Sequence, residues 1–214
     1  MNTEAVIAFF DKLAPDWDAE MIRDDAIIAR ILDGARVSVG DRVLDVATGT
    51  GVLIPDYLAR GVSHVTGIDV SPAMAAIAKE KFENDARVDI LCADATTFRT
   101  DERFDRIMIY NALPHFPSPE ALFSRLTKLL LPGGTLTVAH GFGRKKLDDH
   151  HRRTASDVSV PLPETEALVS AMLADPAMRL AVSVDTEEMF QLTVVMSSSG
   201  IAQTIPTTIS RMRF

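Results

Sequence analysis

Three features that would place the chain in a specialised class are scarce or absent. Cys92 is the only cysteine among 214 residues, so no internal disulfide can form, which fits a reducing compartment. No apolar run approaches the ~20 residues that a membrane-spanning helix needs. Basic residues are outnumbered, 22 against 30 acidic ones, and the formal net charge is −8. Because a phosphate backbone attracts a surplus of Lys and Arg, nucleic acid is disfavoured as the main partner. We expect a cytoplasmic protein that uses neither nucleic acid nor a membrane as partner; the oligomeric state is left open.

Strand-like and helix-like stretches alternate along most of the chain, which predicts an α/β fold with a mostly parallel sheet. The length suits one domain over 1–214, with an N-terminal helical cap at 1–35 and a polar insert at 141–162. Nothing in the sequence assigns a structure to the tail at 198–214. The expected helices are 3–13, 19–35, 51–60, 71–82, 118–130 and 163–175. The expected strands are 42–47, 64–69, 87–94, 104–112 and 135–140, followed by an antiparallel edge pair at 178–186 and 189–197.

The stretch "RVLDVATGTGVL" joins the first strand to the next helix through a turn of small residues, Ala47, Gly49 and Gly51. Glycine has no Cβ, so a ligand can approach the backbone at the carboxyl end of the strand, where ligands of open α/β sheets bind. A dinucleotide and S-adenosylmethionine are the two candidates. The dinucleotide pattern wants a third glycine where Ile54 stands, and Asp45 at the strand end would repel a pyrophosphate. The turn therefore favours a ligand that carries an ammonium group.

Acidic residues also end the next two strands. Asp69 has two carboxylate oxygens that could accept both hydroxyls of a ribose. Its alternative role as a helix cap is already filled by Ser71. Asp94 could accept a hydrogen bond from an adenine amino group, with the Ala95 backbone beside it, and turn formation is an equally good explanation of this aspartate.

Taken together, these stretches resemble the class I S-adenosylmethionine-dependent methyltransferases. "LDVATGTG" is similar to their glycine motif, with Ala47 where many members have glycine, as the ubiquinone/menaquinone-methyltransferase-like branch tolerates. "GIDVSPAM" resembles the ribose segment, "ADAT" the adenine segment, and "FDRIMIYNALPHF" with "LLLPGGTLTVAH" the fourth and fifth strands. The resemblance implies a Rossmann-like, doubly wound sheet of seven strands in the order 3-2-1-4-5-7-6. It also implies that the cofactor contacts Asp45, Ala47, Thr48, Gly49, Gly51, Asp69, Val70, Met74, Asp94, Ala95, Asn111 and Ala112.

The implied activity is methyl transfer by in-line displacement, which needs no covalent nucleophile on the protein. Cys92 lies inside a predicted strand and is expected to be a small core residue. Asn111-Ala112-Leu113-Pro114 lacks the paired prolines and aromatic residue of enzymes that methylate planar nitrogens, which favours a small-molecule acceptor. Two alternatives are a cofactor-binding module that acts through a partner and an NAD-dependent oxidoreductase.

Histidines are the candidates for removing a proton from the acceptor. His115 follows the fourth strand and His140 ends the fifth, and either could serve as a general base near neutral pH. A purely structural role is the competing interpretation for each. A metal site built from His115, His140 and one of His150 and His151 would lack any short ligand motif, so we expect no metal.

Two further segments bear on the acceptor. Phe9, Phe10 and Trp17 flank the break between the first two helices and either cover the cofactor or simply pack on the sheet. The mixed-charge run 143–153 contains Arg144, Lys145, Arg152 and Arg153, which could receive an acidic acceptor. Runs of this kind more often form a solvated surface.

Overall fold

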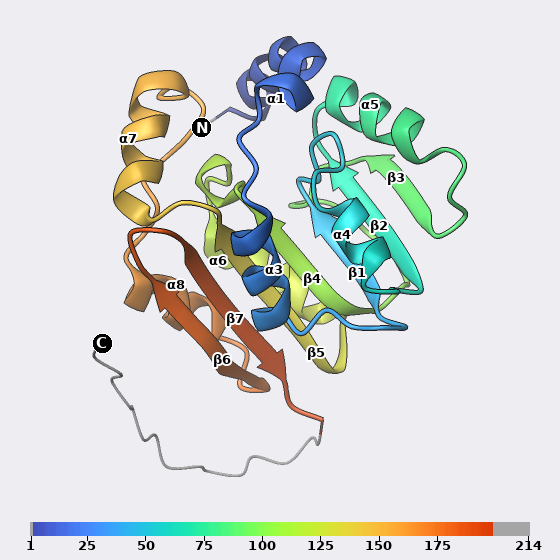
Figure 1. The fold of residues 1–214 in the computed structure, drawn as a ribbon. Helices are drawn as coiled ribbons and strands as arrows, with labels where there is room; N and C mark the ends of the chain where they lie inside the picture. Colours follow the sequence, from blue (N-terminus) through green and yellow to red (C-terminus); the bar gives the residue numbers. More distant parts are fainter. Residues whose placement is uncertain (1, 199–214) are drawn as a thin grey trace.

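The computed structural model describes residues 2–198, and its centre is a seven-stranded sheet with the order β3-β2-β1-β4-β5-β7-β6 (Figure 1). Strands β1 to β5 pair in parallel, whereas β7 runs antiparallel to both β5 and β6. The expected strand order and the antiparallel pair at the edge are confirmed. The strands are β1 (Arg42–Val46), β2 (His64–Asp69), β3 (Val88–Cys92), β4 (Phe104–Tyr110), β5 (Leu130–His140), β6 (Met178–Asp185) and β7 (Phe190–Met196).

Helices cover both faces of the sheet because its strands alternate the direction of their apolar side chains. Val43, Val65 and Met108 pack with the helices α3 and α4, while Leu44 and Ile107 pack with α6 and α8 on the other face. Both faces are therefore buried, as a doubly wound fold requires. The α-helices are α1 (Thr3–Leu13), α2 (Trp17–Glu20), α3 (Asp25–Gly34), α4 (Ile54–Ala59), α5 (Pro72–Phe82), α6 (Pro119–Leu126), α7 (Arg144–Thr154) and α8 (Thr165–Met172). Short 3-10 turns lie at Ala14–Asp16, Leu113–His115 and Thr127–Leu129.

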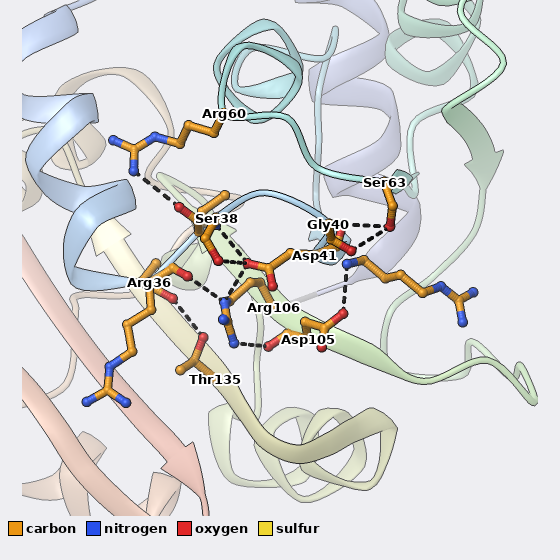
Figure 2. Close-up of polar contacts among 12 residues, drawn as sticks. Arg36, Ser38, Gly40, Asp41, Arg60, Ser63, Asp105, Arg106 and Thr135 are labelled. Carbon is orange, nitrogen blue, oxygen red and sulfur yellow. Dashed lines mark hydrogen bonds and ion pairs between the residues drawn. The ribbon is translucent and has the colours of Figure 1, made fainter.

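A polar network fastens the amino ends of the central strands (Figure 2). The Arg106 Nε of β4 lies 2.9 Å from Oδ2 of Asp41 and donates to the carbonyl oxygen of Arg36 at 2.8 Å. The same Asp41 oxygen accepts a hydrogen bond from the backbone N–H of Ser38 at 2.8 Å. From β5, the Thr135 hydroxyl donates to a carbonyl in the segment that precedes this loop. This network lies at the edge of the sheet opposite to the carboxyl ends of the parallel strands.

The carboxyl ends of the parallel strands face α1 and α7, which lie beyond this edge of the sheet (Figure 1). One of these helices was not expected: the polar insert predicted at 141–162 contains α7. Leu147 is the only fully buried residue of α7, so the helix lacks the apolar periodicity that would reveal it in the sequence. The boundaries of the helical cap also differ from the prediction.

A single helix over 19–35 is a wrong prediction, because the chain is extended at Met21 and a new helix begins after Asp24. The Asp24 side chain caps α3 by accepting the N–H of Ile27 at 3.0 Å. Arg23, between the two helices, turns away to bind both carboxylate oxygens of Asp56 at 2.6 Å. The break therefore follows from a local cap and a long-range ion pair.

Cys92 is a second correction, since it is an exposed free cysteine and not a core residue. It ends β3, the outer strand of the sheet, whose other side chains are partly or fully exposed. Among residues 2–198, no helix has both the length and the apolar composition needed to cross a bilayer. The predicted tail at 198–214 lies, apart from its first residue, outside the described part of the chain.

Candidate functional site

A cavity of about 710 Å³ opens at the carboxyl edge of the sheet, within the range of roughly 300–1,000 Å³ typical of small-molecule sites. The glycine turn after β1 and the ends of β2, β3 and β4 form one part of its lining. The helices α1 and α2 and one face of α7 form the rest. The cavity thus lies where the strand order reverses between β1 and β4, the position expected for a ligand in this kind of sheet.

Eleven of the twelve residues expected to contact the cofactor line this cavity. The exception is Gly51, which is fully enclosed and serves the packing of the turn. Its φ is +84°, and a Cβ added there would come within 2.5 Å of the Phe82 ring. The eleven are Asp45, Ala47, Thr48, Gly49, Asp69, Val70, Met74, Asp94, Ala95, Asn111 and Ala112.

The turn itself is left-handed at several positions. Ala47 has φ +56° and Gly49 has φ +59°, and a Cβ at Gly49 would lie 4.0 Å from the Trp17 Nε1 atom. For alanine the left-handed region costs roughly 1–2 kcal/mol, so the surrounding structure must hold it there. The backbone of the turn is consequently exposed to the cavity with little side-chain cover.

Asp45 presents a carboxylate almost entirely withdrawn from solvent at the start of this turn. Its two oxygens accept hydrogen bonds from the Thr48 hydroxyl at 2.7 Å and from the Tyr57 hydroxyl at 3.1 Å. Burial has the largest effect on Asp45 and raises its pKa to about 7. The negative charge of Asp69 also raises this pKa, whereas the two hydrogen bonds lower it. A cation in the cavity would favour the ionised form, so the site is set to take up a positively charged group.

Asp69 holds the turn and the next helix together. Its Oδ2 accepts the N–H of Gly49 at 2.8 Å, and its Oδ1 accepts the N–H of Ser71 at 2.9 Å. Both oxygens were expected to be open to a ribose, yet each already accepts one backbone hydrogen bond. A carboxylate oxygen has a second lone pair, so each can still accept one more.

Asp94 lines the cavity and also shapes its own loop. Its Oδ1 accepts both the N–H and the hydroxyl of Thr96 at 2.7 Å. This is the turn formation that the sequence left as an equal explanation. Its Oδ2 accepts no hydrogen bond from the described residues.

Acidic residues of the helical cap, which the sequence did not single out, tie this cap to the cofactor segments. Asp18 accepts the Thr50 hydroxyl at 2.5 Å and lies 2.8 Å from the Lys81 Nζ atom. Asp11 accepts the hydroxyl of Ser71 and the N–H of Ala73 at the start of α5. No local pattern marks these contacts, since each joins residues 32 to 63 positions apart.

The aromatic residues of the cap, Phe9, Phe10 and Trp17, all line the cavity. Nε1 of Trp17 is buried and has no hydrogen-bond partner among the described residues. A buried indole N–H without a partner is costly, because this donor normally finds an acceptor. Its place beside the glycine turn indicates an acceptor that belongs to a ligand.

Comparison with known proteins agrees with this geometry. Residues 43–134, from β1 into β5, match the family model described as a methyltransferase domain. Phosphoethanolamine N-methyltransferase 2 of Caenorhabditis elegans is 35% identical over 112 residues, which are 50% of this chain and 26% of that protein. Demethylmenaquinone methyltransferase of Renibacterium salmoninarum is 29% identical over 145 residues, which are 64% of this chain and 58% of that protein. The chain therefore spans less than two thirds of either relative.

A solved structure shares the fold across almost the whole chain. It is the N-methyltransferase NodS of Bradyrhizobium japonicum WM9 in complex with S-adenosyl-L-homocysteine, with a TM-score of 0.69 and 14% identity over 92% of this chain and 99% of NodS. Residues 43–134 thus match a methyltransferase domain, and the chain has the fold of the class I S-adenosylmethionine-dependent methyltransferases. S-adenosylmethionine is the cofactor of this class, and it is the cofactor that the glycine turn and its acidic neighbours indicated.

The two histidines expected to act as general bases lie in different surroundings. His115 lines the cavity, and its Nδ1 lies 2.8 Å from the carbonyl oxygen of Val158. Because a carbonyl only accepts, Nδ1 carries the proton of the neutral ring and Nε2 is left as an acceptor. Burial lowers the pKa of His115, so the ring is neutral at neutral pH.

His140 does not reach the cavity. Its side chain is fully buried, neither ring nitrogen has a partner among the described residues, and burial lowers its pKa to about 3. The sequence offered His115 and His140 equally as general bases, whereas the structure brings only His115 to the cavity. His151, from α7, takes the other place, with its ring centroid 5.1 Å from that of His115.

A metal site from His115, His140 and one of His150 and His151 is not formed. Across residues 2–198, no three His, Cys, Asp or Glu side chains gather as a metal ion would need. The buried, separate position of His140 is the physical reason.

Proposed function

We propose that this domain transfers the methyl group of S-adenosylmethionine to a small-molecule acceptor. The observation that carries the proposal is the buried carboxylate of Asp45 beside an open, left-handed glycine turn that lines a large cavity. When bound, the cofactor supplies an electrophilic methyl group on a cationic sulfur, so the protein needs to bind, orient and exclude water.

Each acidic residue at a strand end has a distinct part in this proposal. Asp45 attracts the positively charged methionine end, and Asp69 uses its remaining lone pairs for the ribose hydroxyls. Asp94 and the Ala95 backbone receive the adenine. Trp17 lines this half of the cavity and offers its N–H, which has no partner among the described residues, to an oxygen or nitrogen of the cofactor.

A small acceptor is supported by the cavity and by the charge of the chain. The cavity is bounded by helices on the side away from the sheet, which leaves room for a compact molecule rather than a polymer. The net charge of −8 disfavours nucleic acid. The names of the two relatives, which refer to demethylmenaquinone and phosphoethanolamine, point the same way.

His115 is our candidate for the general base, should the acceptor lose a proton. Its free Nε2 and its place in the cavity wall support this role. His140 is not retained as a candidate, because a fully buried ring outside the cavity cannot reach the acceptor. His115→Ala should lower turnover with a proton-bearing acceptor, whereas His140→Ala should leave the removal of this proton unaffected. Equal turnover in both variants and the wild type would refute the role.

Calorimetry with S-adenosylhomocysteine and with NADH tests the cofactor first. We expect S-adenosylhomocysteine to bind, Asp69→Asn to weaken its binding, and the exposed Asp89→Asn, far from the turn, to leave it unchanged. Binding of NADH alone would support an oxidoreductase instead. Transfer of a labelled methyl group to members of an acceptor library then tests catalysis, and cofactor binding without transfer to any of them would favour a binding module.

A further inference from the structure

The charges that line the cavity are separated into two halves. All four acidic residues, Glu20, Asp45, Asp69 and Asp94, belong to α2 or to the strand ends on the cofactor side. Both permanently cationic residues, Lys146 and Arg153, belong to α7. A chain with a net charge of −8 has thus concentrated positive charge on one wall of its cavity.

We propose that the methyl acceptor is a mainly apolar molecule with an anionic group, a carboxylate or a phosphate, which Lys146 and Arg153 bind at the mouth of the cavity. This inference rests on the proposed function and names the class of its acceptor. It distinguishes these two residues from the other cations of the run 143–153.

Helix geometry sets Lys146 and Arg153 apart from their neighbours. They are seven residues apart, about two helical turns, so they share one face of α7 with His150, and all three line the cavity together with Phe142, which precedes the helix. Lys145 and Arg152, one position earlier in each case, do not line it. The run is therefore more than a solvated surface, since one of its faces lines the cavity.

Other cations of the same run are already engaged. The Arg144 guanidinium donates to the carbonyl oxygens of Leu162 and Pro163 at 2.7 Å and lies 3.3 Å from a carboxylate oxygen of Asp185. Arg152 lies 3.1 Å from Asp149. Arg144 therefore stabilises the protein's own loops, and Arg152 is paired with a carboxylate on the outside of the helix.

Lys146 and Arg153 have no carboxylate partner within ion-pair distance among the described residues. The Nζ of Lys146 lies 4.4 Å from the ring centroid of Phe142, and the Nε of Arg153 donates to the backbone carbonyl of Asp149 at 3.2 Å. Both side chains are exposed at the mouth of the cavity. An anionic group bound there would keep part of its hydration, which avoids the cost of burying a charge.

Deeper in this half of the cavity the lining is apolar and aromatic. Val6, Phe9, Phe10, Phe116 and Leu147 line it, together with the paired rings of His115 and His151. An apolar body fits this surface better than a hydrated one.

His151 supplies a second sign of a ligand. Its Nδ1 is buried and has no hydrogen-bond partner among the described residues. Burial lowers the pKa of His151 to about 4, so this ring is neutral and adds no charge. A polar atom of the acceptor would satisfy it.

The test uses the full chain saturated with S-adenosylhomocysteine and three pairs of probes measured by calorimetry. The anionic probes are 2-naphthoate, 2-naphthyl phosphate and octanoate, and the neutral controls are 2-naphthamide, 2-naphthol and octanamide. The variants are Lys146→Met, Arg153→Gln and the double variant. Lys145→Met with Arg152→Gln is the matched control, because it removes the same charges from the same helix outside the cavity.

We expect at least one anionic probe to bind more tightly than its neutral counterpart. The double variant should weaken the affinity for this anionic probe about five-fold, as two exposed charges allow. The control pair should change that affinity less than two-fold, and no variant should change the affinity for the neutral probes. The preference should shrink from 50 mM to 500 mM salt. A preference for the carboxylates or for the phosphate identifies the anion.

Three results would overturn the proposal. They are no preference for any anionic probe, an equal effect of the cavity pair and the control pair, and a loss of S-adenosylhomocysteine affinity in the double variant, which would assign the cations to the cofactor. Failure of the wild type to bind S-adenosylhomocysteine is a separate result and refutes the proposed function itself.

Discussion

The hydroxyl of Tyr57 donates a hydrogen bond to Oδ1 of Asp45 at 3.1 Å, with both side chains buried under the glycine turn. Burial and the nearby carboxylate raise the pKa of Tyr57, so the phenol keeps the proton that it donates. Thr48 donates to the other oxygen at 2.7 Å. Asp45 is thereby held in a fixed orientation, and its pKa of about 7 makes its charge sensitive to what enters the cavity.

Cofactor binding should release a proton from Asp45 near neutral pH. An ammonium or sulfonium group favours the ionised carboxylate, so affinity for S-adenosylmethionine should rise as pH increases from 6 to 8. Calorimetry in buffers of different ionisation enthalpy measures the protons released. Asp45→Asn should bind more weakly and lose the pH dependence. A wild-type affinity that does not vary over this range would contradict the assignment of Asp45.

Tyr57→Phe should weaken cofactor binding without unfolding the domain. The variant removes one hydrogen bond to Asp45 and so raises its pKa further, which makes the ionised form harder to reach. We expect a loss of stability of about 1 kcal/mol and a several-fold weaker affinity at pH 7 that recovers partly at pH 8. Urea denaturation and calorimetry measure the two effects. A loss of affinity that is the same at both pH values would mean that Tyr57 acts through packing alone.

Gly51→Ala should destabilise the domain more than Gly40→Ala, although both glycines have φ +84°. A methyl group at Gly51 would meet the Phe82 ring at 2.5 Å, whereas nothing lies within 4 Å of a methyl group at Gly40. The Gly40 variant thus measures backbone strain alone, about 1 kcal/mol. Overpacking should add about 1–3 kcal/mol in the Gly51 variant. Equal midpoints in urea would show that Phe82 moves aside freely.

Trp17 should report cofactor binding directly, because it is the only tryptophan of the chain. Its indole N–H is buried beside the turn and has no partner in residues 2–198, so a bound ligand should change the environment of the ring and its fluorescence. Titration with S-adenosylhomocysteine should give a saturable change with the affinity found by calorimetry. Trp17→Phe should bind several-fold more weakly, since it cannot donate this hydrogen bond. An unchanged emission at saturation would place the ligand elsewhere.

His140 should make the domain sensitive to acid. Its folded pKa of about 3 lies below the ordinary value of 6.5, so the unfolded chain binds the proton first. The neutral ring of His140 therefore supports the folded state fully above pH 6.5, and this support is lost as pH falls toward 3, because the unfolded chain takes up the proton. Between pH 7 and pH 5 the free energy of unfolding should fall by about 2 kcal/mol from this group alone. Over the same interval, the free energy of unfolding of His140→Leu should fall by correspondingly less than that of the wild type. Urea denaturation at each pH measures this difference. An equal fall in both proteins would contradict this role of His140.

The sheet, and the strand-end residues that line the cavity, were predictable because short-range patterns encode them. Alternating apolar residues mark each strand, and the placement of Asp45, Asp69 and Asp94 after three of them locates the ligand edge. Gly49 and Gly51 were equally visible, but the sequence did not reveal that Gly51 makes room for Phe82 instead of the cofactor.

The α7 side of the cavity was not predictable for a physical reason. The inward face of α7 borders a cavity, so it carries Lys146, His150 and Arg153 where a core helix would carry apolar residues. The contacts of Asp11 with Ser71 and of Asp18 with Thr50 join distant segments through single hydrogen bonds, which leave no periodic trace. His140 was misplaced because the end of a strand does not specify which neighbouring side chains enclose it.

The anchoring of the helical cap at both α5 and the glycine turn links the two halves of the reaction chamber. Asp18 fastens it above the donor through Thr50, while Phe10 in the same cap stacks edge-on against His115 on the acceptor side, with centroids 4.9 Å apart. One segment therefore contributes to the cavity wall on both the glycine-turn side and the α7 side, so any displacement of this segment would alter both sides at once.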